Sequence, residues 1–285
     1  MVFRVVDAHI HLEPWGKLKP AVAEVLERDR PDLAHILRYV SDPGLLISHH
    51  DEQEISRVAV INYPSPEVMG FGNEVNEIGA RYRDQYPDRI IAFGGVDPHA
   101  KGDPAHQIRH LLDHLRMDGV KLHPPHQLVA ANSYLDGNSV LSEVYSLCQE
   151  RAVPVMIHTG TSIFPGSRIK FGDPIHCDDV AVDYPELPLI LAHGGRPLWM
   201  ETAFFLARRH ANVYLDLSGI PPQKLLDYFP RLESIAHKCL FGTDWPSPGV
   251  RSIRENVDTF LKQPLSDQAK QQILAGTADK LFPPR

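Results

Sequence analysis

Eight short apolar segments recur along this 285-residue chain, and each is rich in valine, isoleucine, leucine or phenylalanine. Near-continuous apolar runs of this kind are typical of parallel β-strands whose two faces are both covered. After the first segment, the starts lie about 25–35 residues apart, which is the length of one strand–helix unit. The predicted strands are Arg4–His11, Arg57–Asn62, Ile90–Val96, Gly119–His123, Pro154–His158, Pro188–His193, Asn212–Leu217 and Lys238–Asp244.

Amphipathic segments fill the gaps between these predicted strands. Their apolar residues recur at three- and four-residue spacing, which predicts helices that pack one face on a sheet. Ser266 is placed to cap the last of them. The predicted helices are Asn73–Tyr86, Pro104–Leu115, Val140–Arg151, Leu198–Arg209, Pro222–Ala236, Ser252–Leu261 and Ser266–Leu281.

The alternation of strand and helix, repeated eight times, predicts an α/β fold of the (β/α)8 TIM barrel type. An open doubly wound sheet is the structural alternative. It would need a glycine-rich phosphate turn after the first strand, and the chain reads HIHLEP there. We therefore expect one barrel domain over residues 1–285. The segment Leu12–His49 is longer than a barrel loop requires, and we expect it to be a helical insertion over the barrel mouth, with helices at Lys17–Arg28 and Pro31–Val40.

The charge balance argues against partners that bind basic surfaces. The chain has 29 Lys and Arg against 36 Asp and Glu, a net charge of −7. It therefore lacks the excess of cations that would displace counterions from nucleic acids or anionic membranes. We expect a small-molecule substrate, no nucleic-acid partner and no membrane partner, and a homo-oligomer stays open.

Cysteine usage and the N-terminal segment favour a cytoplasmic protein. Cys148, Cys177 and Cys239 are widely separated and form no CxxC motif, so a reducing compartment is the simplest expectation. The N-terminal segment MVFRVVDAHIHLEP has too short an apolar run for a signal peptide.

Histidines recur at the ends of the predicted strands, where the active site of a (β/α)8 barrel is built. His9 and His11 are two residues apart on one strand, so they share a face, and two imidazoles at this spacing can bind one metal ion. His158, His193 and Asp244 end three other predicted strands. The pattern predicts a metal site, in which Asp244 can also accept a proton from bound water; capping of the next helix is the alternative role for Asp244.

Four further residues are candidates for substrate binding. Lys121 and His123 share a strand face, and Lys121 can bind an anionic substrate, bridge two metals if carbamylated, or pack its stem with its head in water. Arg196 can pair with a substrate carboxylate or lie on the surface. Trp245, together with other aromatic residues, can reach the barrel mouth and stack on an aromatic acid.

The motifs VDAHIH, GVKLHP, PVMIHTG, LILAHGG and LFGTDWP occur in this order, and together they resemble the amidohydrolase superfamily. The resemblance is greatest to its amidohydrolase-related branch, which includes aminocarboxymuconate semialdehyde decarboxylase and resorcylate-type decarboxylases. It implies metal ligands at His9, His11, His158 and Asp244. It also implies that His193 polarises the substrate or holds the reactive water, and that Lys121 stands near the lysine that is carbamylated in binuclear members.

These features favour a metal-dependent hydrolase that acts on an ester, lactone or amide bond of a small, carboxylated molecule. Zn²⁺ is the expected metal, with Mn²⁺ as the alternative and one ion per chain, and two ions are not excluded. Non-oxidative decarboxylation of a small aromatic or unsaturated acid is the alternative reaction. A third possibility is a non-enzymatic metal-binding or scaffold protein, which would leave the strand-end histidines without a role.

Overall fold

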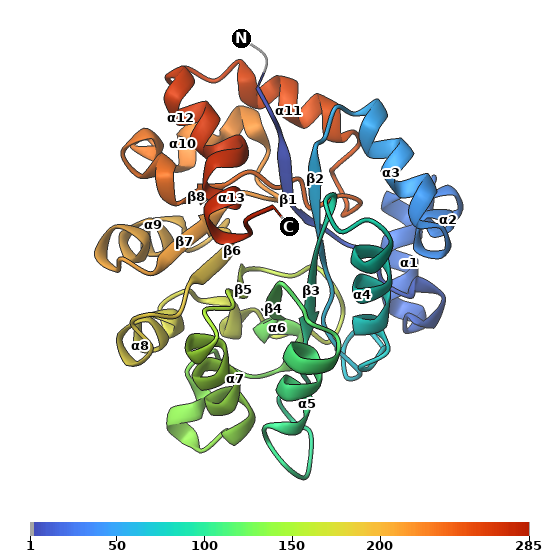
Figure 1. The fold of residues 1–285 in the computed structure, drawn as a ribbon, viewed down its shortest axis with the longest axis vertical. Helices are drawn as coiled ribbons and strands as arrows, with labels where there is room; N and C mark the ends of the chain where they lie inside the picture. Colours follow the sequence, from blue (N-terminus) through green and yellow to red (C-terminus); the bar gives the residue numbers. More distant parts are fainter. Residues whose placement is uncertain (1–2, 285) are drawn as a thin grey trace.

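The computed structural model describes residues 3–284, and it contains a single eight-stranded sheet in which each strand pairs in parallel with the next (Figure 1). The predicted (β/α)8 TIM barrel is confirmed. Residues 1–2 and 285 of the predicted domain lie outside the described residues. The strands are β1 (Val6–Ile10), β2 (Arg57–Ile61), β3 (Ile90–Gly95), β4 (Gly119–Leu122), β5 (Val155–Gly160), β6 (Leu189–Arg196), β7 (Val213–Asp216) and β8 (Cys239–Leu240).

Backbone hydrogen bonds join the first strand to the chain at and after the last one. The amide of Ala8 donates to the carbonyl of Phe241 at 2.9 Å, and that of His11 donates to Trp245 at 2.9 Å. Between them, the amide of Asp244 donates to the carbonyl of His9 at 2.8 Å. These contacts close the sheet into a barrel and bring Asp244 beside His9.

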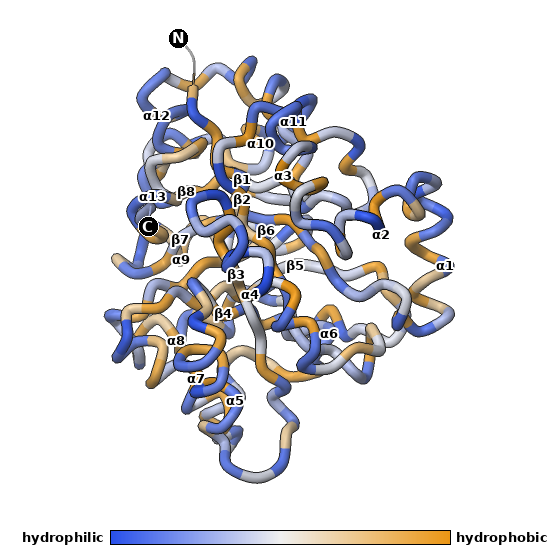
Figure 2. Tube along the Cα trace, turned by 45° about the vertical axis from the view of Figure 1, so that its right-hand side comes forward, coloured by the Kyte–Doolittle hydropathy of each residue, from blue (hydrophilic) through white to orange (hydrophobic). Residues whose placement is uncertain are grey.

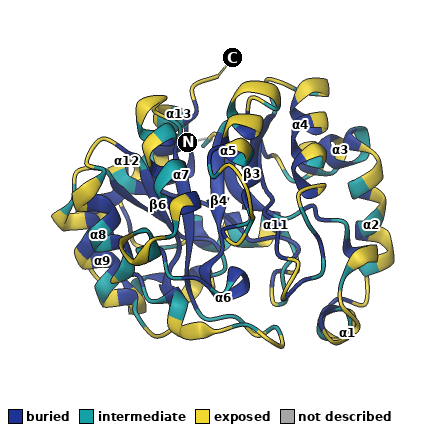
Figure 3. Ribbon diagram, turned by 90° about the horizontal axis from the view of Figure 1, so that it is seen from below, coloured by how far each residue is buried: buried dark blue, intermediate teal, exposed yellow. Residues whose placement is uncertain are grey.

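The strands are buried on both faces, as their near-continuous apolar sequences predict. In β2, Val58 and Val60 belong to the large core between strands and helices, whereas Ala59 and Ile61 belong to a second core that fills the barrel. This alternation follows the two-residue period of a strand. Figure 2 shows the apolar strands running through the centre of the molecule, and Figure 3 shows them buried beneath helices whose outer faces are exposed.

Two irregularities in strand register lie beside predicted site residues. The pairing of β1 with β2 shifts by one residue between Asp7 and Ile10, so a bulge surrounds His9. The pairing of β5 with β6 shifts between His158 and Gly160. A bulge turns the following side chains toward the other face of a strand, and bulges are common next to active sites.

Helices lie between the strands and surround the barrel. The α-helices are α1 (Pro20–Asp29), α2 (Leu33–Ser41), α3 (Pro43–Glu52), α4 (Val75–Gln85), α5 (His106–Arg109), α6 (Pro124–Gln127), α7 (Ser139–Glu150), α8 (His176–Asp183), α9 (Met200–Arg209), α10 (Leu225–Tyr228), α11 (Ile253–Leu261), α12 (Asp267–Gln271) and α13 (Thr277–Leu281). Among the described residues, no helix is both long enough and apolar enough to cross a lipid bilayer.

One predicted helix was wrong, and two helices of the structure were not predicted. The expected helix Pro222–Ala236 is broken into α10 and a 3₁₀ helix (Leu232–Lys238), because Pro230 between them has no amide hydrogen to continue a helix. Neither α3 nor α8 was predicted. The start of α3 carries Asp42, whose side chain accepts from the amides of Gly44 and Leu45, a capping pattern that was overlooked.

The segment after β1 is helical, as predicted, but it covers the mouth only in part. Trp15 and Leu26 contribute to the wall of the central cavity. By contrast, α2 and α3 pack at the side of the barrel (Figure 1). There the rings of Tyr39 and His49 lie 5.6 Å and 5.3 Å from the ring of Trp245. The reason is topological, since α3 is itself the crossover helix that connects β1 to the parallel strand β2.

Candidate active site

Three predicted ligands come together at the C-terminal ends of β1 and β8. His9 Nε2 and His11 Nε2 are 3.2 Å apart, and Asp244 Oδ1 lies 3.7 Å from the first and 3.3 Å from the second. Ligand atoms around one tetrahedral ion, bound at about 2.0–2.2 Å, are separated by roughly 3.3–3.6 Å. The three atoms therefore fit a single divalent metal ion, and they form one of the described groups able to hold one.

In both histidines, a hydrogen bond to Nδ1, on the side of the ring away from Asp244, determines which ring nitrogen is left to bind a metal. His9 Nδ1 lies 2.5 Å from Asp216 Oδ2, and His11 Nδ1 lies 2.8 Å from the carbonyl oxygen of Ile61. Because carboxylates and carbonyls only accept, both Nδ1 atoms carry the hydrogen. Burial works to lower the pKa of His11, but Asp244 and Glu13 raise it overall. In the neutral form of each ring, Nε2 is unprotonated and faces Asp244, as a metal ligand requires.

The charges around Asp244 favour its ionised form. Burial alone would raise the pKa of Asp244, but the neighbouring His193, His11 and His9 hold that pKa well below its usual value. Burial lowers the pKa of His9 well below its usual value, and positive charge on Lys121 lowers it further. The site thus combines an ionised carboxylate with a neutral imidazole, the protonation states in which both bind metals.

Both predicted catalytic residues adopt left-handed backbone conformations. His193 has φ +65° and Asp244 has φ +67°, values that are uncommon outside glycine, asparagine and aspartate. His193 lies behind the ligand group, with its ring centroid 5.0 Å from that of His9 and 4.7 Å from that of His158. The left-handed residues within β6 and after β8 therefore aim the two side chains at the same region.

His158 lies beside the ligand group without joining it. Its Nε2 is 3.2 Å from the carbonyl oxygen of Thr161, and its ring stacks on His123 with the centroids 3.8 Å apart. Among the described residues, the three-atom group comprises His9, His11 and Asp244. A role for His158 as the fourth ligand stays a prediction.

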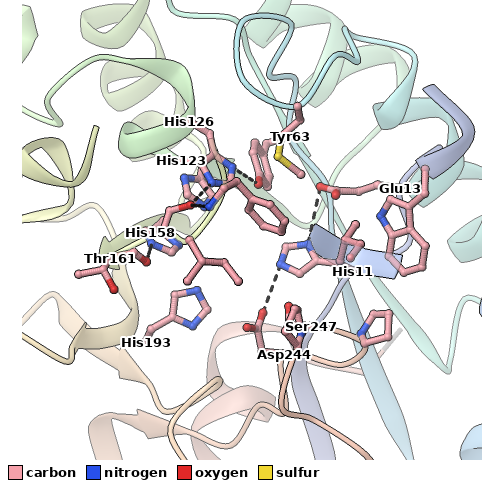
Figure 4. Close-up of a pocket in the computed structure, with 18 of the residues that line it drawn as sticks. His11, Glu13, Tyr63, His123, His126, His158, Thr161, His193, Asp244 and Ser247 are labelled. Atoms are coloured by element: carbon pink, nitrogen blue, oxygen red, sulfur yellow. Dashed lines mark hydrogen bonds and ion pairs between the residues drawn. The ribbon is translucent and has the colours of Figure 1, made fainter. Parts of the chain in front are cut away.

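A cavity of about 300 Å³ opens above these residues. Its lining includes the predicted residues His11, His123, His158, His193, Arg196 and Asp244. The lining also includes the aromatic residues Trp15, Tyr63 and Phe164. Figure 4 shows the imidazoles of His123, His126, His158 and His193 on one side of the cavity and His11, Glu13 and Asp244 on the other.

The structure places two of the predicted substrate contacts outside the cavity lining. Lys121 is fully buried on β4, and its Nζ has no hydrogen-bond partner among the described residues. Burial lowers the pKa of Lys121 to about 8. Trp245 packs against Tyr39, His49 and His50, because its side chain turns outward from the barrel toward α2 and α3.

Several residues of the site were missed or given only a minor part in the sequence interpretation. Glu13 lines the cavity with Oε1 3.7 Å from His11 Nδ1, and burial raises its pKa to about 7. His126 contacts both Tyr63 Oη at 2.9 Å and Ser162 Oγ at 2.7 Å. Ser218 is buried beside Asp216. Glu13 and Ser218 could have been found from the sequence, because both are polar residues that closely follow a strand, β1 and β7 respectively.

Comparisons with known proteins agree with this architecture. The chain is 21% identical over 338 residues to decarboxylase macB of Penicillium terrestre, covering 98% of this chain and 94% of that one. A TIM-barrel protein of Bordetella bronchiseptica matches with a TM-score of 0.76 at 22% identity, covering 98% of each chain. A dihydroxybenzoic acid decarboxylase from Polaromonas, solved with bound manganese and 2-nitroresorcinol, matches with a TM-score of 0.67 at 18% identity over 99% of this chain and 97% of that one.

The likeness to these solved structures concerns the fold. The family assignment rests on the match of residues 6–283 to the model described as amidohydrolase. The motifs that end β1, β4, β5, β6 and β8 all lie within the matched range. The chain therefore belongs to the amidohydrolase family.

Proposed function

We propose that this protein is a metal-dependent decarboxylase of a small aromatic or unsaturated carboxylic acid. One observation carries the proposal: His11 and Asp244 border a cavity whose wall contains the rings of Trp15, Tyr63 and Phe164. Aromatic walls favour a planar substrate through stacking. Arg196 in the same wall supplies a guanidinium that can pair with a carboxylate.

The residues divide the work between holding the acid and moving a proton. His9, His11 and Asp244 would hold a divalent ion, either Zn²⁺ or Mn²⁺, and such an ion, when bound, acts as a Lewis acid toward substrate oxygens. Loss of CO2 leaves an electron pair on carbon, which must take one proton. We assign the handling of that proton to Asp244 and His193, which both face the cavity.

Hydrolysis, the reaction that the sequence alone favoured, is the second candidate. It would use the same ligands, with Asp244 accepting a proton from water. The preference for hydrolysis rested on the carboxylate of Asp244. The aromatic residues in the cavity wall instead favour a planar acid, the substrate of the proposed decarboxylation. The names of macB and of the Polaromonas relative also favour decarboxylation.

Turnover in isotopic water tests the choice. The protein, loaded with Zn²⁺ or Mn²⁺, is incubated with a panel of hydroxylated benzoic acids, unsaturated acids and lactones in D2O and in H2¹⁸O. We expect released CO2 and a product with one carbon-bound deuterium and no ¹⁸O. Incorporation of ¹⁸O without CO2 would establish hydrolysis instead, and Asp244→Asn is the inactive control.

A cytoplasmic location is part of the proposal. Cys148, Cys177 and Cys239 are all buried and unpaired, which suits a reducing compartment. Fractionation of the source cells would test it.

A further inference from the structure

Ser218 lies directly behind the proposed metal site, in the turn after β7. The residue is fully buried. Its hydroxyl oxygen is 2.7 Å from Asp216 Oδ2, 3.1 Å from His9 Nδ1 and 3.0 Å from His193 Nδ1. One hydroxyl therefore touches a predicted metal ligand, the carboxylate that supports this ligand, and the predicted catalytic histidine.

The direction of each hydrogen bond follows from counting donors. An ionised Asp216 can only accept, so the Ser218 hydroxyl donates its single hydrogen to that carboxylate. The amide of Ser218 also donates to Asp216, at 2.9 Å from Oδ1. With its hydrogen used, the hydroxyl oxygen can only accept from the two rings. Nδ1 of His9 and Nδ1 of His193 must then both carry a hydrogen.

A second contact supports the same state of His193. The backbone carbonyl oxygen of Ser218 lies 3.1 Å from His193 Nδ1, and this oxygen can only accept. The next residue, Gly219, has φ +66°, and a Cβ there would lie 3.2 Å from His193 Nδ1. The tight turn after β7 is thus built close against the inner edge of the His193 ring.

We propose that Ser218 is a positioning residue whose hydroxyl holds His9 and His193 in the same tautomer, with Nδ1–H directed inward and Nε2 unprotonated. In His9 this leaves Nε2 free for a metal ion. In His193, which lines the cavity, it leaves Nε2 free to accept a proton or hydrogen bond from a bound substrate. The catalytic consequence for His193 rests on the proposed function, whereas the tautomer itself does not.

The same hydroxyl argues against a metal ion in the group formed by His9, His193 and Asp216, the other described group of side chains that could hold one. Ser218 Oγ lies 3.1 Å from His9 Nδ1, 3.0 Å from His193 Nδ1 and 2.7 Å from Asp216 Oδ2. These are hydrogen-bond distances, longer than the roughly 2.0–2.2 Å of zinc ligands. This group is therefore a hydrogen-bonded network behind the proposed metal site.

Nitrogen-15 NMR of the metal-free protein, labelled at histidine, measures the tautomers directly. Spectra of His193→Asn and His9→Asn assign the two rings. We expect both rings of the wild type to carry Nδ1–H at pH 8. In Ser218→Ala, the backbone carbonyl of residue 218 still accepts from His193, so we expect the His193 signals to move only part of the way toward a mixture of both tautomers. The carboxylate of Asp216 keeps most of His9 unchanged. A matched control is Ser247→Ala, which also removes a serine beside the cavity and should leave the His193 signals unchanged.

Metal affinity supplies a second readout that needs no substrate. Loss of a supporting hydrogen bond typically weakens metal binding by about 10–100-fold. Since Asp216 remains in Ser218→Ala, we expect a loss of about tenfold in Zn²⁺ affinity by chelator competition. Finding Nε2–H on His193 in the wild type would overturn the proposal without any variant. Unchanged tautomers and unchanged Zn²⁺ affinity in a folded Ser218→Ala would also overturn it, and neither result depends on which reaction is catalysed.

Discussion

Individual atoms decide what this site can bind. Nε2 of His9 and of His11 face one oxygen of Asp244 because each Nδ1 is held by an acceptor behind the ring. The sequence predicted the two histidines from their spacing and their place at a strand end. It could not predict which acceptor holds which ring, since Asp216 and Ile61 lie far from the HxH motif in the chain and reach it only when the barrel closes.

Removing a ligand should remove the metal. We expect His11→Ala to retain less than about a tenth of the metal bound by the wild type, because only two of the three ligand atoms, those of His9 and Asp244, remain. Elemental analysis of protein purified without chelator measures this. His158→Ala should lose less metal, because His158 Nε2 must first leave the carbonyl of Thr161. Equal losses of metal in the two variants would mean that His158 binds the metal as directly as His11 does.

The backbone at Asp244 sets which substitution is informative. Asparagine tolerates the left-handed conformation that Asp244 adopts at φ +67°, so Asp244→Asn should fold normally while losing its negative charge. We expect its melting temperature to stay within a few degrees of the wild type and its turnover to fall at least about 100-fold. Asp244→Val, with a branched side chain at the same φ, should melt clearly lower by calorimetry.

Arg196 provides a test of substrate charge. Its Nη1 donates to the carbonyl oxygen of Gly219, which orients the guanidinium beside the cavity. If the substrate is a carboxylate, Arg196→Lys should raise KM about tenfold, equal to roughly 1.4 kcal/mol, because lysine cannot form the two-pronged contact. Steady-state kinetics checks this, with Arg168→Lys, outside the cavity lining, as the control. An unchanged KM would contradict a carboxylate contact at Arg196.

The positions of the strands were more predictable from the sequence than the bulges within them or the directions of side chains after them. All eight strands were predicted because apolar runs buried on both faces look alike at any position in the barrel. The bulge beside His9 was not, since a register shift depends on the neighbouring strand. Likewise, the outward turn of Trp245 depends on α2 and α3, so the sequence alone could not show that this side chain lies outside the cavity lining.

The buried histidine of α3 should make this element sensitive to acid. His50 is fully buried, and burial lowers its pKa to about 4 from an unfolded value of 6.5. The unfolded chain therefore binds the proton first, so the contribution of His50 to stability is complete above pH 6.5 and is lost as the pH falls toward 4. Between pH 7 and pH 5 this loss is about 2 kcal/mol.

Urea denaturation at pH 7 and at pH 5 measures the effect. We expect His50→Met to lose about 2 kcal/mol less stability than the wild type between these two pH values. The exposed His237, replaced by methionine, is the control. The same pH dependence in His50→Met and the wild type would mean that other buried histidines account for the acid sensitivity.

For the whole molecule, a bound metal should act as a stabilising ligand. An ion that binds only the folded chain adds about 2.7 kcal/mol when its concentration is 100 times its Kd. For a chain of this size that corresponds to a rise of about 4–5 °C in melting temperature. Calorimetry with added Zn²⁺ or Mn²⁺, after dialysis against a chelator, should show the rise in the wild type and not in His11→Ala. An equal rise in both would point to binding elsewhere.

The hydrogen bond from the amide of Asp244 to the carbonyl of His9 joins the first strand of the barrel to the turn after the last. During synthesis, the ribosome releases His9 and His11 with the first strand, and Asp244 emerges only after all eight strands have been made. A nascent chain thus carries an incomplete set of ligands until the last turn of the barrel has been made. Tight metal capture should begin only when the eighth strand docks, which makes the ion a reporter of finished assembly.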